Sequence, residues 1–306
     1  MTDSGAIDFM VSQYHKFTTH LDAAEHSMNA GVDLNSGNNF VLLSNSTRVS
    51  TAQIDAALTR LMHARMAMGL FDSPETIAYS SLGPEDIFNA AHKKLALTMS
   101  QKSIVMLKNE GAAMPVKLSG PGAVKTVAVV GWGANDSYAP LANYMGCGYS
   151  SWSPRLSNCS IITPLMAIQE RFAAAGAKVT YSHGCDVESN DTSGFSAATA
   201  AAKAADLVIF VGGNRNCEGG QGHGGAHCES EGHDRPDLEM PGVQTQLLKE
   251  LYAANKNTVL LALTGGPISM NWEAANLPAI FVIWCLPRTI LLYGIDAHLY
   301  MYGMSI

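Results

Sequence analysis

The chain has few charged residues and no excess of basic ones. Only 15% of its 306 residues are charged, and 26 acidic residues outnumber 19 basic ones, which gives a formal net charge of −7. A protein with this balance lacks the positive field that attracts nucleic acid, so we expect no nucleic-acid partner. With 47% hydrophobic residues, the sequence predicts a globular chain of one large domain or two smaller ones.

Long hydrophobic runs are also missing. No apolar stretch reaches the roughly 18 residues that a membrane helix needs. The N-terminus lacks the basic and apolar regions of a signal peptide. The sequence therefore predicts no membrane span and no leader in this chain.

The six cysteines form no Cys-x-x-Cys pair, which argues against a thioredoxin-like site or a zinc ribbon. Cys147 with Cys159, and Cys217 with Cys228, bracket loop-like stretches, as short-range disulfides of an exported protein do. The glycine run 217–228 also holds two histidines and could in principle bind zinc, but its spacings match no standard site. We expect a disulfide-closed glycine loop there and no metal.

Nucleotide and acyl-transfer motifs are absent as well. The sequence has no Gly-x-Ser-x-Gly elbow and no phosphate-binding Walker sequence. Residues 131–136 (GWGAND) begin like a dinucleotide fingerprint, but Asp136 stands where the third glycine should be. We expect no cofactor.

What is present changes in character near residue 120. Helical periodicity dominates before it, in residues 21–31, 50–69 and 84–109, with a polar, Pro-containing connector at 70–83. After it, buried-type strands alternate with helices. The predicted strands are 125–131, 178–184, 206–213, 257–266 and 278–285, and the predicted helices are 163–176, 195–206 and 242–255. Continuous apolar strands joined by helices predict a layered α/β domain with a mostly parallel sheet, whose ligand crevice lies at the carboxyl ends of the strands.

One segment at that edge concentrates acid. Residues 228–242 (CESEGHDRPDLEMPG) contain five carboxylates and one arginine. We interpret Asp237 and Glu239 as residues of a solvated loop or helix caps. The remaining acids are Glu229, Glu231 and Asp234, and Arg235 follows them. In such a pattern, repulsion between like charges can raise the pKa of one carboxyl, while the arginine holds another carboxyl in place. A carboxyl that stays protonated near neutral pH is what a general acid requires.

The run ESEGHDRPDLEMPGVQ resembles the signature of family 3 glycoside hydrolases, nearest to the β-xylosidase type. Further segments agree with the family in order, and the resemblance covers most of residues 2–287. These segments are AGVDL (30–34), MGLFDSPE (68–75), SIVMLKNEGAAMPV (103–116), VAVVGWGAND (127–136), NYMG (143–146), ITPLMAI (162–168), VTYSHGC (179–185) and LLALTGGPISM (260–270).

The resemblance implies a (β/α)8 barrel followed by an α/β sandwich. It places the catalytic nucleophile at Asp3, in TDSGAI, and the acid/base at Glu231, with Glu229 as the alternative. It implies structural or substrate-binding roles for Asp234 and Arg235, and a site position for His15, where a buried packing histidine is an equal alternative. Two roles are equally open for four further residues at the crevice: they either line the subsites that bind sugar or pack against neighbouring side chains. These residues are Trp132, Asn135, Trp152 and Asn214.

The expected domains are a barrel remnant at 1–72, a linker with helices at 73–120, the sandwich at 121–287 and an aberrant tail at 288–306. In the remnant, 30–34 is expected to be the final barrel strand and 50–69 the final barrel helix. Most of the barrel that the family places before Asp3 is not in this sequence, so we expect exposed edges that favour self-association.

The resemblance thus implies a retaining β-glycosidase that acts from chain ends on β-xylosides or β-glucosides, crippled by truncation. An oligosaccharide or an aryl or alkyl β-glycoside is the expected substrate, and the parent protein is expected to be extracellular or secretory. The alternative is a carbohydrate-binding or scaffold fragment without catalysis.

Overall fold

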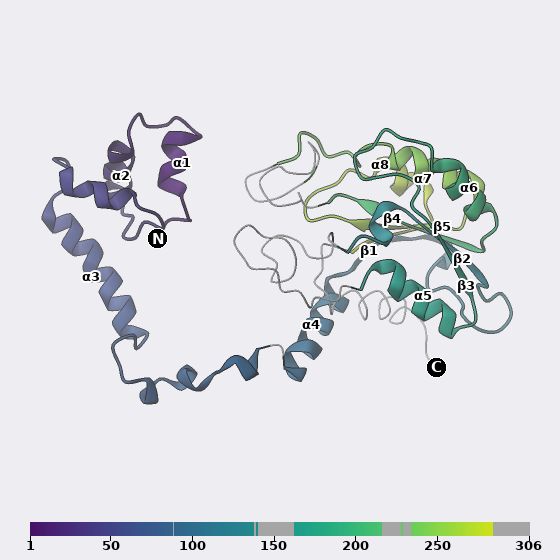
Figure 1. Cartoon of the computed structure of the whole chain (residues 1–306), viewed down its shortest axis with the longest axis horizontal. Coiled ribbons are helices and arrows are strands. Elements are labelled where there is room, and N and C mark those ends of the chain that lie inside the picture. Colours follow the sequence, from purple (N-terminus) through teal and green to yellow (C-terminus); the bar gives the residue numbers. More distant parts are fainter. Residues whose placement is uncertain (88, 138, 140–161, 216–227, 229–233, 284–306) are drawn as a thin grey trace. The chain divides into compact units, whose positions relative to one another are not determined.

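The computed structural model describes residues 1–87, 89–137, 139, 162–215, 228 and 234–283. The chain divides into two compact units, Met1–Ile87 and Phe88–Ile306 (Figure 1). Each unit is described by itself below.

The first unit is helical. Its main helices are α1 (Ala6–Ser12), α2 (His20–Asn29) and α3 (Thr51–Ala67). The 3-10 segments are η1 (Asn39–Asn45), η2 (Pro74–Thr76), η3 (Ala78–Ser81) and η4 (Pro84–Asp86). Thr19 caps α2, and Ser50 with Gln53 forms a capping box that starts α3, which agrees with the helix start predicted from the sequence.

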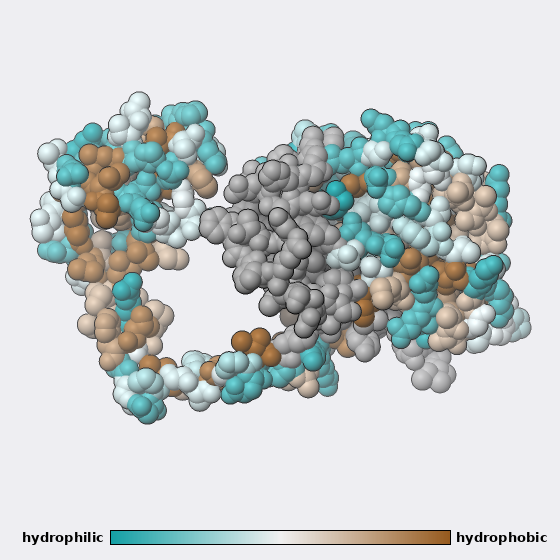
Figure 2. Space-filling model, viewed as in Figure 1, coloured by the Kyte–Doolittle hydropathy of each residue, from teal (hydrophilic) through white to brown (hydrophobic). Residues whose placement is uncertain are grey.

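The core of this unit is small. Four buried side chains form it, namely Ala24, Met28, Leu43 and Ala57. A row of apolar residues on α3 is left outside that core: Ile54, Leu58 and Met66 are 38%, 52% and 60% exposed. Figure 2 shows hydrophobic surface along α3 and along the segment that follows it. The first unit therefore presents a row of exposed apolar side chains along α3.

The prediction of a barrel strand at residues 30–34 is wrong. No residue from 1 to 87, all of which the structure describes, lies in a strand. The backbone N–H of Thr2 donates to the Leu34 carbonyl oxygen (2.9 Å), and that of Gly5 donates to Ser36 (2.9 Å). Two isolated bonds make no ladder, and a strand is defined by its ladder to a neighbour. The apolar pattern of residues 30–34 is compatible with a strand, but it does not show whether a second strand lies beside them to form the ladder.

The second unit contains a six-stranded sheet with the order β1-β6-β5-β4-β2-β3. The strands are β1 (Val105–Asn109), β2 (Thr126–Val130), β3 (Lys178–Ser182), β4 (Leu207–Gly213), β5 (Thr258–Leu263) and β6 (Ala279–Val282). Strands β2 to β6 pair in parallel, and β1 pairs antiparallel with β6. The mostly parallel sheet predicted from the sequence is confirmed.

Helices cover both faces of the sheet (Figure 1). Helix α5 (Pro164–Ala174) packs on one face, and α6 (Phe195–Lys203), α7 (Gln244–Ala254) and α8 (Asn271–Asn276) pack on the other. Side chains along each strand alternate between the faces: Leu207 and Ile209 point to the α5 side and Val208 and Phe210 to the other. The central strands β2, β4, β5 and β6 are mostly apolar because both of their faces are buried, whereas the edge strands β1 and β3 are partly exposed and include polar residues.

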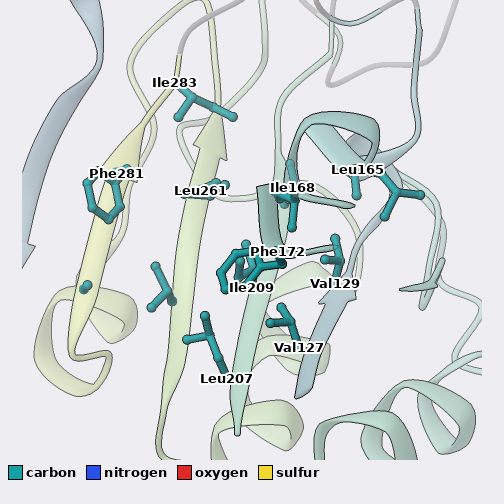
Figure 3. Close-up of a cluster of buried hydrophobic side chains, with 14 of the residues drawn as sticks. Val127, Val129, Leu165, Ile168, Phe172, Leu207, Ile209, Leu261, Phe281 and Ile283 are labelled. Carbon is teal, nitrogen blue, oxygen red and sulfur yellow. The ribbon is translucent and has the colours of Figure 1, made fainter. Parts of the chain in front are cut away.

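The core under α5 is a cluster of buried apolar side chains (Figure 3). Ile168 and Phe172 of α5 meet Val127 and Val129 of β2 and Ile209 of β4, and each of the five is at most 4% exposed. At about 25 cal/mol per Å² of buried apolar area, a core of this kind is the main stabilising contribution to the fold.

The expected single helix over 84–109 is partly wrong. Helix α4 spans Ala90–Ser103, and the chain then enters β1, whose Val105 and Met106 pair with Val282 and Phe281. Pairing with β6, more than 170 residues away, overrides the helical pattern. The stretch expected as linker and helices also supplies Ile104, Met114 and Val116 to the core, so the compact unit begins well before residue 121.

Candidate functional site at the carboxyl edge of the sheet

The strand order places a topological switch point between β2 and β4. From β2 the chain moves outward to β3, then returns to the other side of β2 and continues through β4, β5 and β6. In open α/β sheets, ligands bind at the carboxyl ends of the strands at such a point. The residues that follow β2 and β4 are therefore the first candidates for a site.

Glycines allow the strand ends to lie close together there. Gly131, after β2, has φ +113°, and a Cβ at this position would collide with the Val211 carbonyl oxygen of β4. Gly213, at the end of β4, has φ +131°, and its Cβ would collide with the Leu263 carbonyl oxygen of β5. Side chains are excluded at both positions, because the backbones of three neighbouring strand ends occupy the space.

A fully buried glutamine ties this edge together. The Oε1 atom of Gln244 accepts from Trp132 Nε1 (2.9 Å) and from the Gly213 backbone N–H (2.8 Å). Its Nε2 atom donates to the carbonyl oxygens of Val187 (2.9 Å), Gly213 (2.9 Å) and Pro241 (3.1 Å). Gln244 therefore links the ends of β2 and β4 with the loop after β3.

The same glutamine closes the base of the acidic segment. Residues 214–243 leave the sheet at Gly213 and return at Gln244, and these two residues are hydrogen-bonded to each other. The chain that carries Glu229, Glu231, Asp234 and Arg235 thus starts and ends at one point of the switch region. Buried hydrogen bonds therefore fix the two ends of this segment to each other.

Arg235 makes a second attachment. Its Nη1 atom donates to the Glu239 carbonyl oxygen (3.1 Å), and its Nη2 atom donates to the Pro267 carbonyl oxygen. Pro267 lies in the loop after β5. Ser269 of that loop donates its backbone N–H to the Leu238 carbonyl oxygen (2.7 Å). The arginine therefore holds residues 235–239 against the neighbouring strand-end loop.

Polar side chains gather around the switch point itself. Arg215 Nη1 lies 3.9 Å from Asp136 Oδ2, which pairs residues that follow β4 and β2. Asp136 Oδ1 also accepts from the Ala139 backbone N–H (3.0 Å). Asn214, which precedes Arg215 in the chain, is only 1% exposed, and neither polar atom of its carboxamide has a hydrogen-bond partner.

The carboxyl end of β3 carries a further chain of hydrogen bonds. His183 Nε2 lies 2.7 Å from Asp186 Oδ1, and Tyr181 Oη lies 3.3 Å from His183 Nδ1. Burial raises the pKa of Tyr181, and the negative charges of Asp136 and Asp186 raise it further. Burial also raises the pKa of the Cys185 thiol, to about 11, so Cys185 stays protonated at neutral pH.

The two candidate residues of the first unit lie on either side of α1. Asp3 is exposed and precedes the helix, and its Oδ1 accepts from the Ser4 backbone N–H (2.7 Å). His15 follows the helix with φ +49°, and its Nδ1 lies 3.1 Å from the Val11 carbonyl oxygen. His15 is exposed, so the alternative of a buried packing histidine is wrong.

The structure describes only some of the predicted site residues of the second unit. Glu229 and Glu231, as well as Trp152, lie outside the described residues. Asp234 is exposed. Cys228 is disulfide-bonded, and its partner lies outside the described residues, because Cys185 carries a free thiol. Trp132 is a packing residue, since it is 3% exposed and bonded to Gln244.

Sequence reasoning missed Gln244 and the Tyr181, His183 and Asp186 chain. Gln244 is part of the family signature, but its hydrogen bonds also reach three distant segments, at Trp132, Gly213 and Val187, that no local pattern connects. His183 and Asp186 are three residues apart directly after a predicted strand, and that spacing was the available signal.

No group of three or more His, Cys, Asp or Glu side chains suited to a metal occurs among the residues that the structure describes. No helix in that same part of the chain is long and apolar enough to cross a membrane.

Comparison with known proteins agrees with this geometry. The sequence model of the glycosyl hydrolase family 3 C-terminal domain matches residues 104–288. A probable exo-1,4-beta-xylosidase of Aspergillus flavus is 31% identical over 289 residues, which is 92% of this chain and 33% of that protein. Beta-D-xylosidase 3 of Arabidopsis thaliana is 29% identical over 93% of this chain and 34% of its own length.

Solved structures give the same assignment. A family 3 exo-beta-xylosidase, solved with a xylobiose aziridine probe, superposes with a TM-score of 0.74 and 26% identity over 97% of this chain and 35% of that one. A β-glucosidase of Erythrobacter marinus gives 0.73 and 25% over 98% and 40%. The chain spans about a third of the length of the curated relatives it matches. The family-specific match covers more than half of the chain, so this chain belongs to glycosyl hydrolase family 3.

Proposed function

We propose that this chain carries the acid-bearing segment and the nucleophile of a retaining β-glycosidase that acts on β-xylosides or β-glucosides. The observation that carries the proposal is the anchored segment 214–243, closed by Gln244 on Gly213 at the switch point of a sheet whose sequence matches family 3. The names of the relatives favour β-xylosides among the candidate substrates.

In the proposed reaction, Asp3 attacks the anomeric carbon while Glu231 protonates the leaving oxygen. Glu231 then deprotonates the water that releases the sugar from Asp3. A retaining mechanism needs the two carboxyls roughly 5–5.5 Å apart. Glu229 is the alternative acid/base, and the hydrogen bonds of Arg235 to two loop carbonyls support its role in shaping this segment.

The experiment is hydrolysis of aryl β-xylosides and β-glucosides by the purified chain, beside the variants Asp3→Asn and Glu231→Gln. Asp55→Asn is the matched control, because Asp55 is an exposed carboxylate on α3. Turnover that both site variants lose and the control keeps supports the proposal. Equal turnover in Asp3→Asn and the wild type refutes the assignment of the nucleophile.

A second candidate function is carbohydrate binding without hydrolysis. It is favoured by the second unit, which has a complete two-sided core of its own. Sugar binding by a soluble, folded chain that shows no turnover would support this candidate.

The disulfide at Cys228 supports an oxidising compartment for the protein, as expected for an exported enzyme. Detection of free thiol at Cys228 in protein recovered from its native source would contradict that location.

A further inference from the structure

The unexplained feature of the switch point is Asn214. Its side chain is 1% exposed, and both Oδ1 and Nδ2 lack a hydrogen-bond partner. Buried polar atoms without partners are rare in folded proteins, because each one costs about 1–3 kcal/mol. This cost disappears when a bound group forms hydrogen bonds with the two unpaired atoms.

The backbone fixes where this residue lies. Asn214 follows β4 directly, and its N–H donates to the Leu263 carbonyl oxygen (2.8 Å) at the end of β5. It is thus the first residue after the strand that borders the switch point. This position and the unpaired carboxamide are independent observations, and both indicate a ligand.

The chemistry of the site restricts what the ligand can be. The carboxamide offers one acceptor and one NH2 donor, and it carries no charge. The nearby charges of Arg215 and Asp136 face each other at 3.9 Å, so the charged groups described here balance. A neutral group that both accepts and donates is complementary to this arrangement. Two neighbouring hydroxyls of a sugar meet that requirement, with one accepting from Nδ2 and the other donating to Oδ1.

We propose that Asn214 is a sugar-binding residue at the switch point between β2 and β4, and that it pairs with a vicinal diol of a neutral glycoside. The identity of the ligand as a sugar rests on the proposed function. In this proposal Asn214 binds sugar hydroxyls through hydrogen bonds and takes no part in the chemical step.

The test uses the full chain and xylobiose as the probe, with affinity measured by ligand-observed NMR titration. Asn214→Leu replaces the carboxamide by an apolar group of similar size, and Asn190→Leu is the matched control at an exposed asparagine. We expect Asn214→Leu to weaken xylobiose binding by about tenfold or more, as loss of hydrogen bonds in a buried site does. The control is expected to bind as the wild type does.

Stability without ligand gives the second readout. Because the carboxamide has no partner in the free protein, Asn214→Leu is expected to unfold at an equal or higher urea concentration than the wild type. A fall in its midpoint would mean that the carboxamide already has a partner in the free protein and would overturn the proposal. Asn214→Ala removes the same polar atoms without adding a branched side chain and serves if the leucine variant does not fold.

The outcomes separate this inference from the proposed function. Unchanged xylobiose affinity in Asn214→Leu, or no binding by the wild type, overturns the role of Asn214, whatever the hydrolysis assay shows. Binding that depends on Asn214 in a chain without turnover supports this role and counts against catalysis. Turnover by the wild type, together with unchanged xylobiose affinity in Asn214→Leu, supports catalysis and counts against the role of Asn214.

Discussion

Replacing Gln244 by leucine tests whether the buried glutamine holds the candidate site together. Leucine has a similar size but makes none of the five hydrogen bonds of the amide. The Trp132 Nε1–H and the Gly213 N–H would lose the acceptor that they share, at 2.9 and 2.8 Å. Two buried donors without partners cost about 1–3 kcal/mol each, which gives about 2–6 kcal/mol. Domains are commonly stable by only about 5–15 kcal/mol.

The assay is equilibrium unfolding in urea, monitored by circular dichroism. The dependence of the unfolding free energy on urea concentration is compared between variants. Gln246→Leu is the control, because Gln246 lies on the same helix with its side chain exposed. The control is expected within about 0.5 kcal/mol of the wild type. If Gln244→Leu does not fold, Trp132→Phe removes one donor and part of a buried ring, and it is expected to cost about 1–3 kcal/mol. A Gln244→Leu protein as stable as the control would refute the reasoning.

Four further predictions concern other parts of the molecule. Asp206→Ala is expected to destabilise the fold at neutral pH, because backbone N–H donation from Lys125, with further bonds from Thr126, lowers the pKa of Asp206. This stabilisation is present above the ordinary aspartate pKa and lost as the pH falls through the lower folded-state pKa, so unfolding curves of variant and wild type should converge in acid. The Cys185 thiol, with its pKa raised to about 11, is expected to resist maleimide labelling at pH 7 until urea unfolds the chain, as peptide mass spectrometry would show; fast labelling of the native protein would contradict its burial. Arg235→Met is expected to lower stability by about 1–2 kcal/mol through loss of its hydrogen bonds to two carbonyl oxygens, measured by thermal unfolding, with Lys94→Met at an exposed position of α4 as the control. Leu58→Gln is expected to change stability by less than about 0.5 kcal/mol and to reduce self-association in analytical ultracentrifugation, since Leu58 is 52% exposed; unchanged association would exclude this face as its cause.

The sheet could be predicted because its signal is local. Strands β2, β4, β5 and β6 are continuous and mostly apolar runs, and α5, α6 and α7 are periodic segments between the strands. Each was recognised within a few residues of its ends. The same local reasoning failed for β1, whose strand conformation depends on pairing with β6, and for residues 30–34, which have no strand beside them.

The candidate site divides in the same way. Residue order alone gave the family resemblance, the acidic segment and the named carboxylates, since these depend on residue types at fixed spacings. The sequence could not show that Gln244 bonds to Gly213, because the two are brought together only when α7 packs on the sheet. It also left open whether Asn214 packs or binds. That choice depends on which groups surround a buried carboxamide, and only the tertiary structure determines those neighbours.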